Sequence, residues 1–142
     1  MLPTYIQPVR MAERNAILTG TLPLNRFTRL LELLANDAGT VAVELRFGRD
    51  AERFHYIQGA ITAKLQLECQ RCLQPFAYDV QIDLNLSPVF DEAAVKKLPS
   101  RYDPLELKED QVALVTVIED ELLLALPLVP KHKDADCASK MP

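Results

Sequence analysis

Two pairs of potential metal ligands stand in this sequence, each with close internal spacing. Cys69 and Cys72 lie in "LECQRCLQPF", and His132 and Cys137 lie in "PKHKDADC". Three thiolates and one imidazole complete the tetrahedral ligand set of a structural zinc site. The two pairs are much further apart than in a compact zinc finger. We therefore expect zinc at Cys69, Cys72, His132 and Cys137 to tie the C-terminal tail to the segment that carries the first pair.

Two other interpretations of the first cysteine pair remain open. Cys69 and Cys72 could be small, half-buried side chains at a turn, because cysteine is often buried for packing alone. A redox pair is less favoured. A redox-active C-x2-C begins a helix whose N-terminus lowers the thiol pKa, whereas Pro75 and a strand-like segment follow here.

Glu119, Asp120 and Glu121 form an acidic run that could in principle hold magnesium for phosphodiester chemistry. Three consecutive acids on a helix point in different directions, so they make a poor cage for a metal ion. Because charge runs normally face water, we expect this run to be a solvated helix face. Glu121 is the exception, since about 200° of helical rotation from Glu119 places it beside the apolar stripe.

Other catalytic groups are scarce. The chain has only two histidines and four glycines, which leaves few general acid–base groups and no glycine-rich phosphate loop. No Ser/His/Asp grouping is readable in the sequence. We therefore expect no catalytic centre, and a protein that is not an enzyme.

The charge of the chain is divided unevenly. The net charge is −4; residues 1–60 carry seven Lys/Arg and six Asp/Glu, whereas residues 61–142 carry nine and fourteen. A dedicated nucleic-acid binder usually shows a basic face, and this composition has none. Any contact with RNA would need a local patch, for which the candidates are Arg10, Arg14, Arg26 and Arg29.

Hydrophobic periodicity predicts the elements that position these residues. Period-two alternation predicts strands over 41–47, 53–68 and 76–86, and a further strand is expected at 16–24. Helical spacing predicts helices over 26–37 and from 112 to Pro127. We expect an irregular N-terminus and a long loop over 87–111 with a short strand at 104–107. The turn between the last two long strands carries Cys69 and Cys72.

These elements predict an α+β fold, an antiparallel β-sheet meander with two packed helices. The 142 residues suit one domain, which we place at 1–130, followed by a polar C-terminal tail at 131–142. The sequence shows no apolar run of transmembrane length and no signal peptide, so a cytoplasmic location is expected.

Three segments together resemble the bacterial YceD family, the large ribosomal RNA subunit accumulation proteins. They are "LECQRCLQPF", "LPSRYDPLEL" and "EDELLLALPLVPKHKDADC", in this order. The resemblance covers about residues 60–137 and is only loose before them. Family members usually continue through an acidic linker to a lysine-rich end, whereas this sequence stops at "CASKMP", so the resemblance implies a truncated tail. The family's recurring positions fall on Cys69, Cys72, Glu119, Glu121, Pro127, Pro130, His132 and Cys137.

The resemblance implies a cytoplasmic, non-enzymatic ribosome biogenesis factor that supports synthesis, processing or stability of large-subunit ribosomal RNA. Its implied partner is large-subunit ribosomal RNA or the precursor large ribosomal subunit, with no membrane and no small-molecule substrate. Two alternatives remain open. One is a metal-dependent RNA-processing enzyme that uses Glu119 and Glu121. The other is a protein-only assembly adaptor that never touches RNA.

Overall fold

A five-stranded sheet forms the body of the protein in a computed structural model that describes residues 2–127. Its strands are β2 (Ile17–Pro23), β3 (Thr40–Arg49), β4 (His55–Glu68), β5 (Pro75–Val89) and β6 (Asp103–Glu106), and they lie in that order. The first four strands form the expected antiparallel meander. β6 pairs parallel to the end of β5, which makes the sheet mixed. The α+β class is confirmed.

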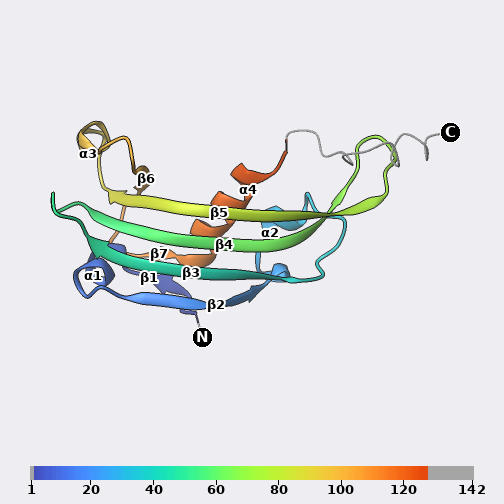
Figure 1. Ribbon diagram of the computed structural model, residues 1–142, viewed down its shortest axis with the longest axis horizontal. Helices are drawn as coiled ribbons and strands as arrows, with labels where there is room; N and C mark the ends of the chain where they lie inside the picture. Colours follow the sequence, from blue (N-terminus) through green and yellow to red (C-terminus); the bar gives the residue numbers. More distant parts are fainter. Residues whose placement is uncertain (1, 128–142) are drawn as a thin grey trace.

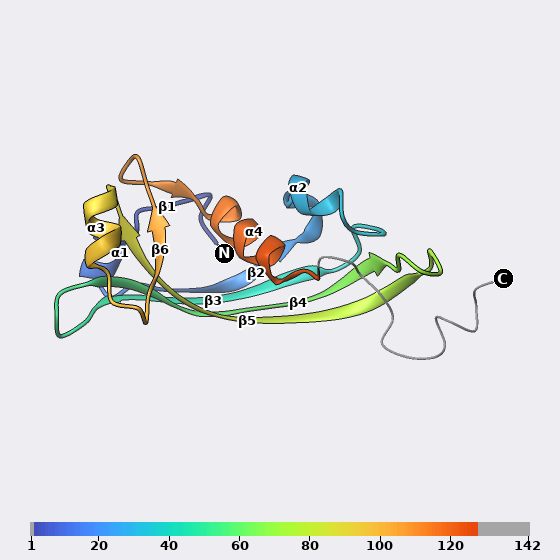
Figure 2. The same ribbon diagram turned by 90° about the horizontal axis from the view of Figure 1, so that it is seen from above.

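Helices and a second small sheet cover one face of this sheet (Figures 1 and 2). The helices are α1 (Pro8–Glu13), α2 (Thr28–Leu31), α3 (Glu92–Lys97) and α4 (Leu114–Ala125), with a 3₁₀ turn at Leu24–Arg26. β1 (Tyr5–Ile6) pairs with β7 (Val112–Ala113) in the two-stranded sheet. None of the helices among residues 2–127 has the length and hydropathy needed to cross a membrane.

Alternation along the long strands builds the core, as the sequence predicts. Buried and exposed positions alternate through residues 41–47 of β3, which places every second side chain beneath the helices. The largest fully buried side chains of the core include Phe27, Leu30, Leu45, Ile57, Ile61, Leu65, Leu114, Ile118 and Leu122. α4 contributes the last three of these through one helical stripe.

The helix expected over 26–37 is wrong in length, because α2 stops at Leu31. Leu34 instead forms an antiparallel bridge with Leu67, and the Ala35 N–H donates to the Gln66 carbonyl at 2.6 Å. These residues pair with the end of β4 on the side that β3, whose pairing stops at Val41 and Ala63, does not reach. Tertiary pairing therefore overrides helical periodicity in this segment.

The expected irregular segments also contain regular structure. Asp91 caps α3 by accepting the Ala94 N–H at 2.7 Å, so part of the expected loop 87–111 is helical. The short strand expected there is present as β6. The N-terminal piece is not irregular, since Pro8 begins α1 at a position where its missing N–H costs nothing.

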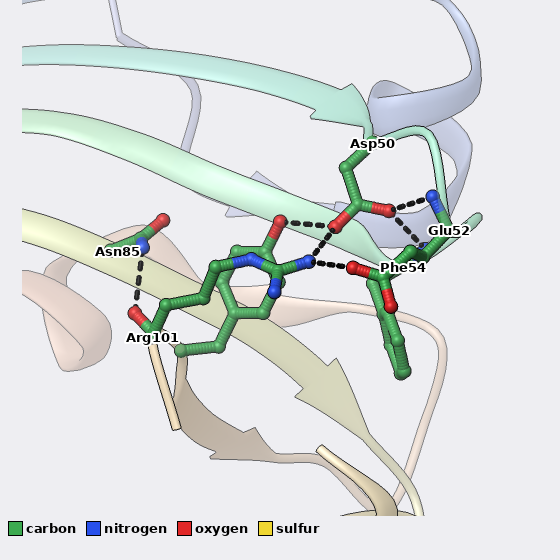
Figure 3. Close-up of polar contacts among 6 residues, drawn as sticks. Asp50, Glu52, Phe54, Asn85 and Arg101 are labelled. Carbon is green, nitrogen blue, oxygen red and sulfur yellow. Dashed lines mark hydrogen bonds and ion pairs between the residues drawn. The ribbon is translucent and has the colours of Figure 1, made fainter. Parts of the chain in front are cut away.

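One end of the sheet is closed by a polar cluster that we call the Asp50 latch, formed by Asp50, Glu52, Arg101 and Tyr102 (Figure 3). Within the β3–β4 turn, Asp50 accepts the N–H groups of Glu52 and Phe54, both at 2.9 Å. From the segment after α3, the Tyr102 hydroxyl and the Arg101 guanidinium donate to Asp50 at 2.6 and 2.8 Å. Arg101 also binds Glu52 at 2.7 Å. The latch thus joins two loops that are far apart in sequence.

The ionisation of Asp50 depends on these donors. Burial alone would raise the pKa of Asp50, but the hydrogen bonds from Tyr102, Arg101 and the turn backbone outweigh it and hold the pKa at about 2. The Asn85 amide donates to the Arg101 carbonyl at 2.7 Å, which fixes the segment that carries Arg101 against β5 (Figure 3).

We predict that Asp50→Asn lowers the free energy of unfolding by about 1 to 3 kcal/mol at pH 7, because charge-assisted hydrogen bonds are lost. The pKa of Asp50 is lower in the folded protein than its ordinary 3.8, so its contribution is present above that pH and disappears as pH falls toward 2. Urea denaturation at pH 7, 5, 3.5 and 2.5 measures this, with exposed Asp37→Asn as the control. A stability gap that stays constant through this range would contradict the assignment.

Candidate functional site

The cysteine pair lies on the β4–β5 turn, at the end of the sheet opposite the Asp50 latch (Figure 1). The Leu73 N–H donates to the Cys69 carbonyl at 2.8 Å, and the Cys69 N–H to the Gln74 carbonyl at 3.0 Å. Leu73 takes a left-handed conformation, with φ of 61°, to close the turn. Cys69 is buried and Cys72 half-buried. One tight turn thus brings both side chains to the same end of the sheet.

The turn is chemically compatible with a metal-binding thiolate. The backbone N–H of Arg71 donates to the sulfur of Cys69 at 3.4 Å. His132 and Cys137, the other two expected zinc ligands, lie outside the described residues, as does Pro130. Within residues 2–127, no group of three or more His, Cys, Asp or Glu side chains is placed to hold a metal ion. The four-ligand zinc site stays a prediction.

The four arginines expected to contact RNA fall into two groups. Arg10 and Arg14 lie on and just after α1, whereas Arg26 and Arg29 lie in the 3₁₀ turn and in α2. Figures 1 and 2 place α1 near one end of the sheet and α2 toward the other. The four side chains therefore do not form one continuous patch.

Glu119 is the centre of the polar contacts between α4 and α2. Its side chain is only 6% exposed, and its two carboxylate oxygens accept three hydrogen bonds. One oxygen accepts the backbone N–H groups of Arg29 and Leu30 at 2.9 and 3.0 Å. The other accepts the Arg29 Nε–H at 3.0 Å. Glu119 thereby satisfies the N–H groups of the second and third residues of α2, which has no side-chain cap from its own sequence.

The expectation that the acidic run is a solvated face is therefore wrong for Glu119. Periodicity along α4 places Glu119 on the polar stripe, and α2 covers that stripe at Glu119, whereas Thr116 and Asp120 stay exposed. Asp120, next in the chain, is half-exposed and accepts the Arg29 guanidinium at 2.6 Å. The hydrogen bond to Asp120, followed in size by the one to Glu119, raises the pKa of Arg29 above its ordinary value.

Glu121 points to a different part of the surface, as its helical position predicts. It lines a groove between α4 and the β5–β6 edge, together with Leu86, Leu105 and Val117. Burial, followed by the nearby charges of Asp103 and Asp120, raises the pKa of Glu121. Glu119 and Glu121 are thus committed to different neighbours.

Sequence reasoning missed two structural roles. Nothing in the sequence pairs Glu119 with α2, because the two lie about ninety residues apart. Arg101 and Tyr102 stand within "LPSRYDPLEL", one of the three segments that carry the family resemblance, and that recurrence is the signal that could have found them. Pro127, another recurring position, follows the end of α4 at Ala125, where a proline does not interrupt helical hydrogen bonds.

Comparisons with known proteins agree on one family. Residues 57–142 match the sequence model of the family described as large ribosomal RNA subunit accumulation protein YceD. A curated relative from Haemophilus influenzae, named large ribosomal RNA subunit accumulation protein YceD, is 34% identical over 137 residues. These cover 96% of this chain and 79% of the relative. No solved structure matches the chain.

We predict that Glu119→Gln lowers the free energy of unfolding by about 1.5 to 3 kcal/mol, because a buried acceptor of two amide hydrogens loses its charge. Its matched control is Asp120→Asn, which removes an exposed contact to the same arginine and should change stability little. Urea denaturation gives the stability, and hydrogen exchange reports on the Arg29 and Leu30 amides directly. Equal effects of the two substitutions on these amides would refute the role given to Glu119.

The zinc prediction has its own test. Protein purified without chelator should contain about one zinc ion per chain, and a Cys69→Ser, Cys72→Ser variant should contain none. Elemental analysis measures both, and His55→Ala, at a histidine outside the predicted ligand set, is the control. A parent protein without metal would leave the cysteines as packed residues of a turn.

Proposed function

We propose that this chain, which belongs to the YceD family of large ribosomal RNA subunit accumulation proteins, is a non-enzymatic factor in ribosome biogenesis. In this role it supports synthesis, processing or stability of large-subunit ribosomal RNA in the cytoplasm. Its partner is that RNA or the precursor large subunit. Family membership supports the link to large-subunit RNA, and the arrangement of the acidic residues supports a role without catalysis.

The hydrogen bonds that Glu119 accepts from α2 are the observation that favours this role over that of an RNA-processing enzyme. A magnesium-dependent nuclease needs carboxylate oxygens that converge on a shared ion. Both oxygens of Glu119 already accept hydrogen bonds from α2, and Glu121 lines a groove on another side of α4. Recruiting Glu119 to a metal would leave the Arg29 and Leu30 amides without their acceptor.

Direct contact with RNA, if it contributes to this role, is best placed at α1. Arg10 and Arg14 are exposed, and Arg14 has no salt-bridge partner among the described residues. Arg29 is already held by two carboxylates, so binding a phosphate would require it to give up Asp120. Arg26, in the 3₁₀ turn before α2, is also exposed. We therefore expect Arg10 and Arg14 to contribute more to RNA affinity than Arg29.

We predict that a bacterial strain without its own family member accumulates less large-subunit than small-subunit ribosomal RNA, and that this chain restores the balance. Purified protein should leave precursor RNA uncut with magnesium or manganese. The measurements are the ratio of the two RNAs on gels and the length of the precursor after incubation.

Two outcomes would redirect the proposal. Precursor cleavage that Glu121→Gln abolishes would establish the RNA-processing enzyme. Restored RNA levels combined with no RNA affinity, and no effect of Arg10→Ala plus Arg14→Ala, would establish the protein-only adaptor. The control for the arginine pair is Arg46→Ala, an exposed arginine of β3 that pairs with Glu44.

A further inference from the structure

The outer edge of β5 lacks a strand partner along most of its length. β5 runs over fifteen residues, from Pro75 to Val89, and pairs with β4 from Pro75 to Leu86. On its other side β6 pairs only from Leu86 to Val89. Among the described residues, nothing pairs with 77–85 on that side. Alternate N–H and C=O groups of this stretch therefore point away from the sheet, as in a strand that can accept another.

α4 extends beyond this edge. Figure 1 shows α4 crossing the sheet from β3 to β5, with its C-terminal turn past the β5 ribbon. That turn carries Leu124, whose side chain is 81% exposed and is the most exposed large hydrophobic among the described residues. Beneath it lies a groove of about 530 Å³, whose apolar lining is Leu86, Pro104, Leu105, Val117, Leu123 and Leu124.

The apolar side chains on the α4 side of β5 continue this groove. Tyr78 and Ile82 point to the same face as the buried Val80 and Leu84, but both remain half-exposed. A strand laid along 77–85 would place every second side chain against them and against Leu124. It would therefore gain both backbone hydrogen bonds and apolar burial.

The charge around the groove determines which strand fits. Its charged lining is Glu106, Asp120 and Glu121, with no lysine or arginine. Arg29 neutralises Asp120, but Glu106, Glu121 and the neighbouring Asp103 form no salt bridge within residues 2–127. Asp83 adds a further exposed carboxylate on the opposite face of β5. Excess negative charge repels RNA phosphates and attracts lysine and arginine.

We propose that the β5 edge and the α4 groove together bind an extended, basic segment of a partner protein, in which apolar residues alternate with lysine or arginine. The segment adds a sixth strand beside residues 77–85. Its apolar side chains enter beneath Leu124, its basic side chains point to the opposite face and meet Asp83, and the groove carboxylates Glu106 and Glu121 attract its net positive charge.

The test uses a fluorescent nine-residue peptide of alternating lysine and valine, with fluorescence anisotropy as the readout. Two further peptides carry N-methyl groups on all lysines or on all valines. Because N–H direction and side-chain direction both alternate with period two in a strand, only one set of N–H groups faces β5. One methylated peptide should bind about tenfold or more weakly, and the other should bind like the parent. Equal binding of the two methylated peptides would rule out strand addition.

Variants of the full chain locate the site. Leu124→Ala should weaken the parent peptide about tenfold through lost apolar burial, and Leu33→Ala, at an exposed leucine near α2, should not. Glu106→Gln plus Glu121→Gln should weaken binding at low salt more than Glu32→Gln plus Glu109→Gln, which removes the same charge elsewhere. Equal effects of the two charge pairs would overturn the proposal.

Hydrogen exchange of the free protein tests whether the edge is available. Outward-facing amides of 77–85 should exchange quickly before peptide is added and slowly afterwards. Slow exchange without peptide would contradict the proposal. If the exchange rate does not depend on protein concentration, another part of this chain covers the edge. If the rate does depend on concentration, a second copy of the chain covers it. The test uses no ribosomal RNA, so its failure would leave the proposed ribosomal role standing.

Discussion

The buried carboxylate of Glu119 on α4 fixes the position of α2. α2 has only four residues, which is too short to form a stable helix alone, and its own sequence offers no cap. A buried carboxylate from α4 supplies the missing acceptor, while Leu30 and Phe27 bury their side chains beneath it. The position of α2 therefore depends on α4, and α4 in turn is held by the apolar face of the sheet.

The Asp50 latch joins two segments at the opposite end of the sheet. There the β3–β4 turn and the segment after α3 are both irregular and contribute little to the core. Asp50 joins them because its four hydrogen bonds keep it ionised in a partly buried position. Glu119 and Asp50 each accept backbone N–H groups and side-chain donors; the donors to Glu119 all belong to α2, whereas those to Asp50 come from two segments. Both acids thus have structural roles.

A smaller group of carboxylates, Glu106, Glu121 and the neighbouring Asp103, lies beside the open edge of β5. The family's link to large-subunit ribosomal RNA raises the question of how an acidic protein meets an anionic polymer. One answer from the charge distribution is that the two partners use different parts of the surface. Arginines on α1 are available for phosphates at one end, while the groove under α4 favours basic protein segments. An assembly factor with both surfaces could bring a protein segment and RNA together.

The sequence by itself determined the long strands, the existence of α4 and the membership in the family. Period-two alternation in 41–47 and 76–86 reports burial of one face, and that signal is local. It also placed Cys69 and Cys72 on the turn between β4 and β5 and Glu121 beside the apolar stripe. The strands, α4 and the place of Glu121 follow from local patterns, which report which side of an element is apolar, whereas the family follows from the three motif segments that resemble it.

Only the tertiary structure decided which polar residues would be buried and with whom. Helical spacing placed Glu119 on a polar face, but it could not show that α2 covers that face from about ninety residues away. The same limit applies to Asp50 with Tyr102, and to Leu34, which leaves its helical pattern to pair with Leu67. Hydrogen bonds between distant segments depend on where the chain brings them, and periodicity along one segment carries no information about the other.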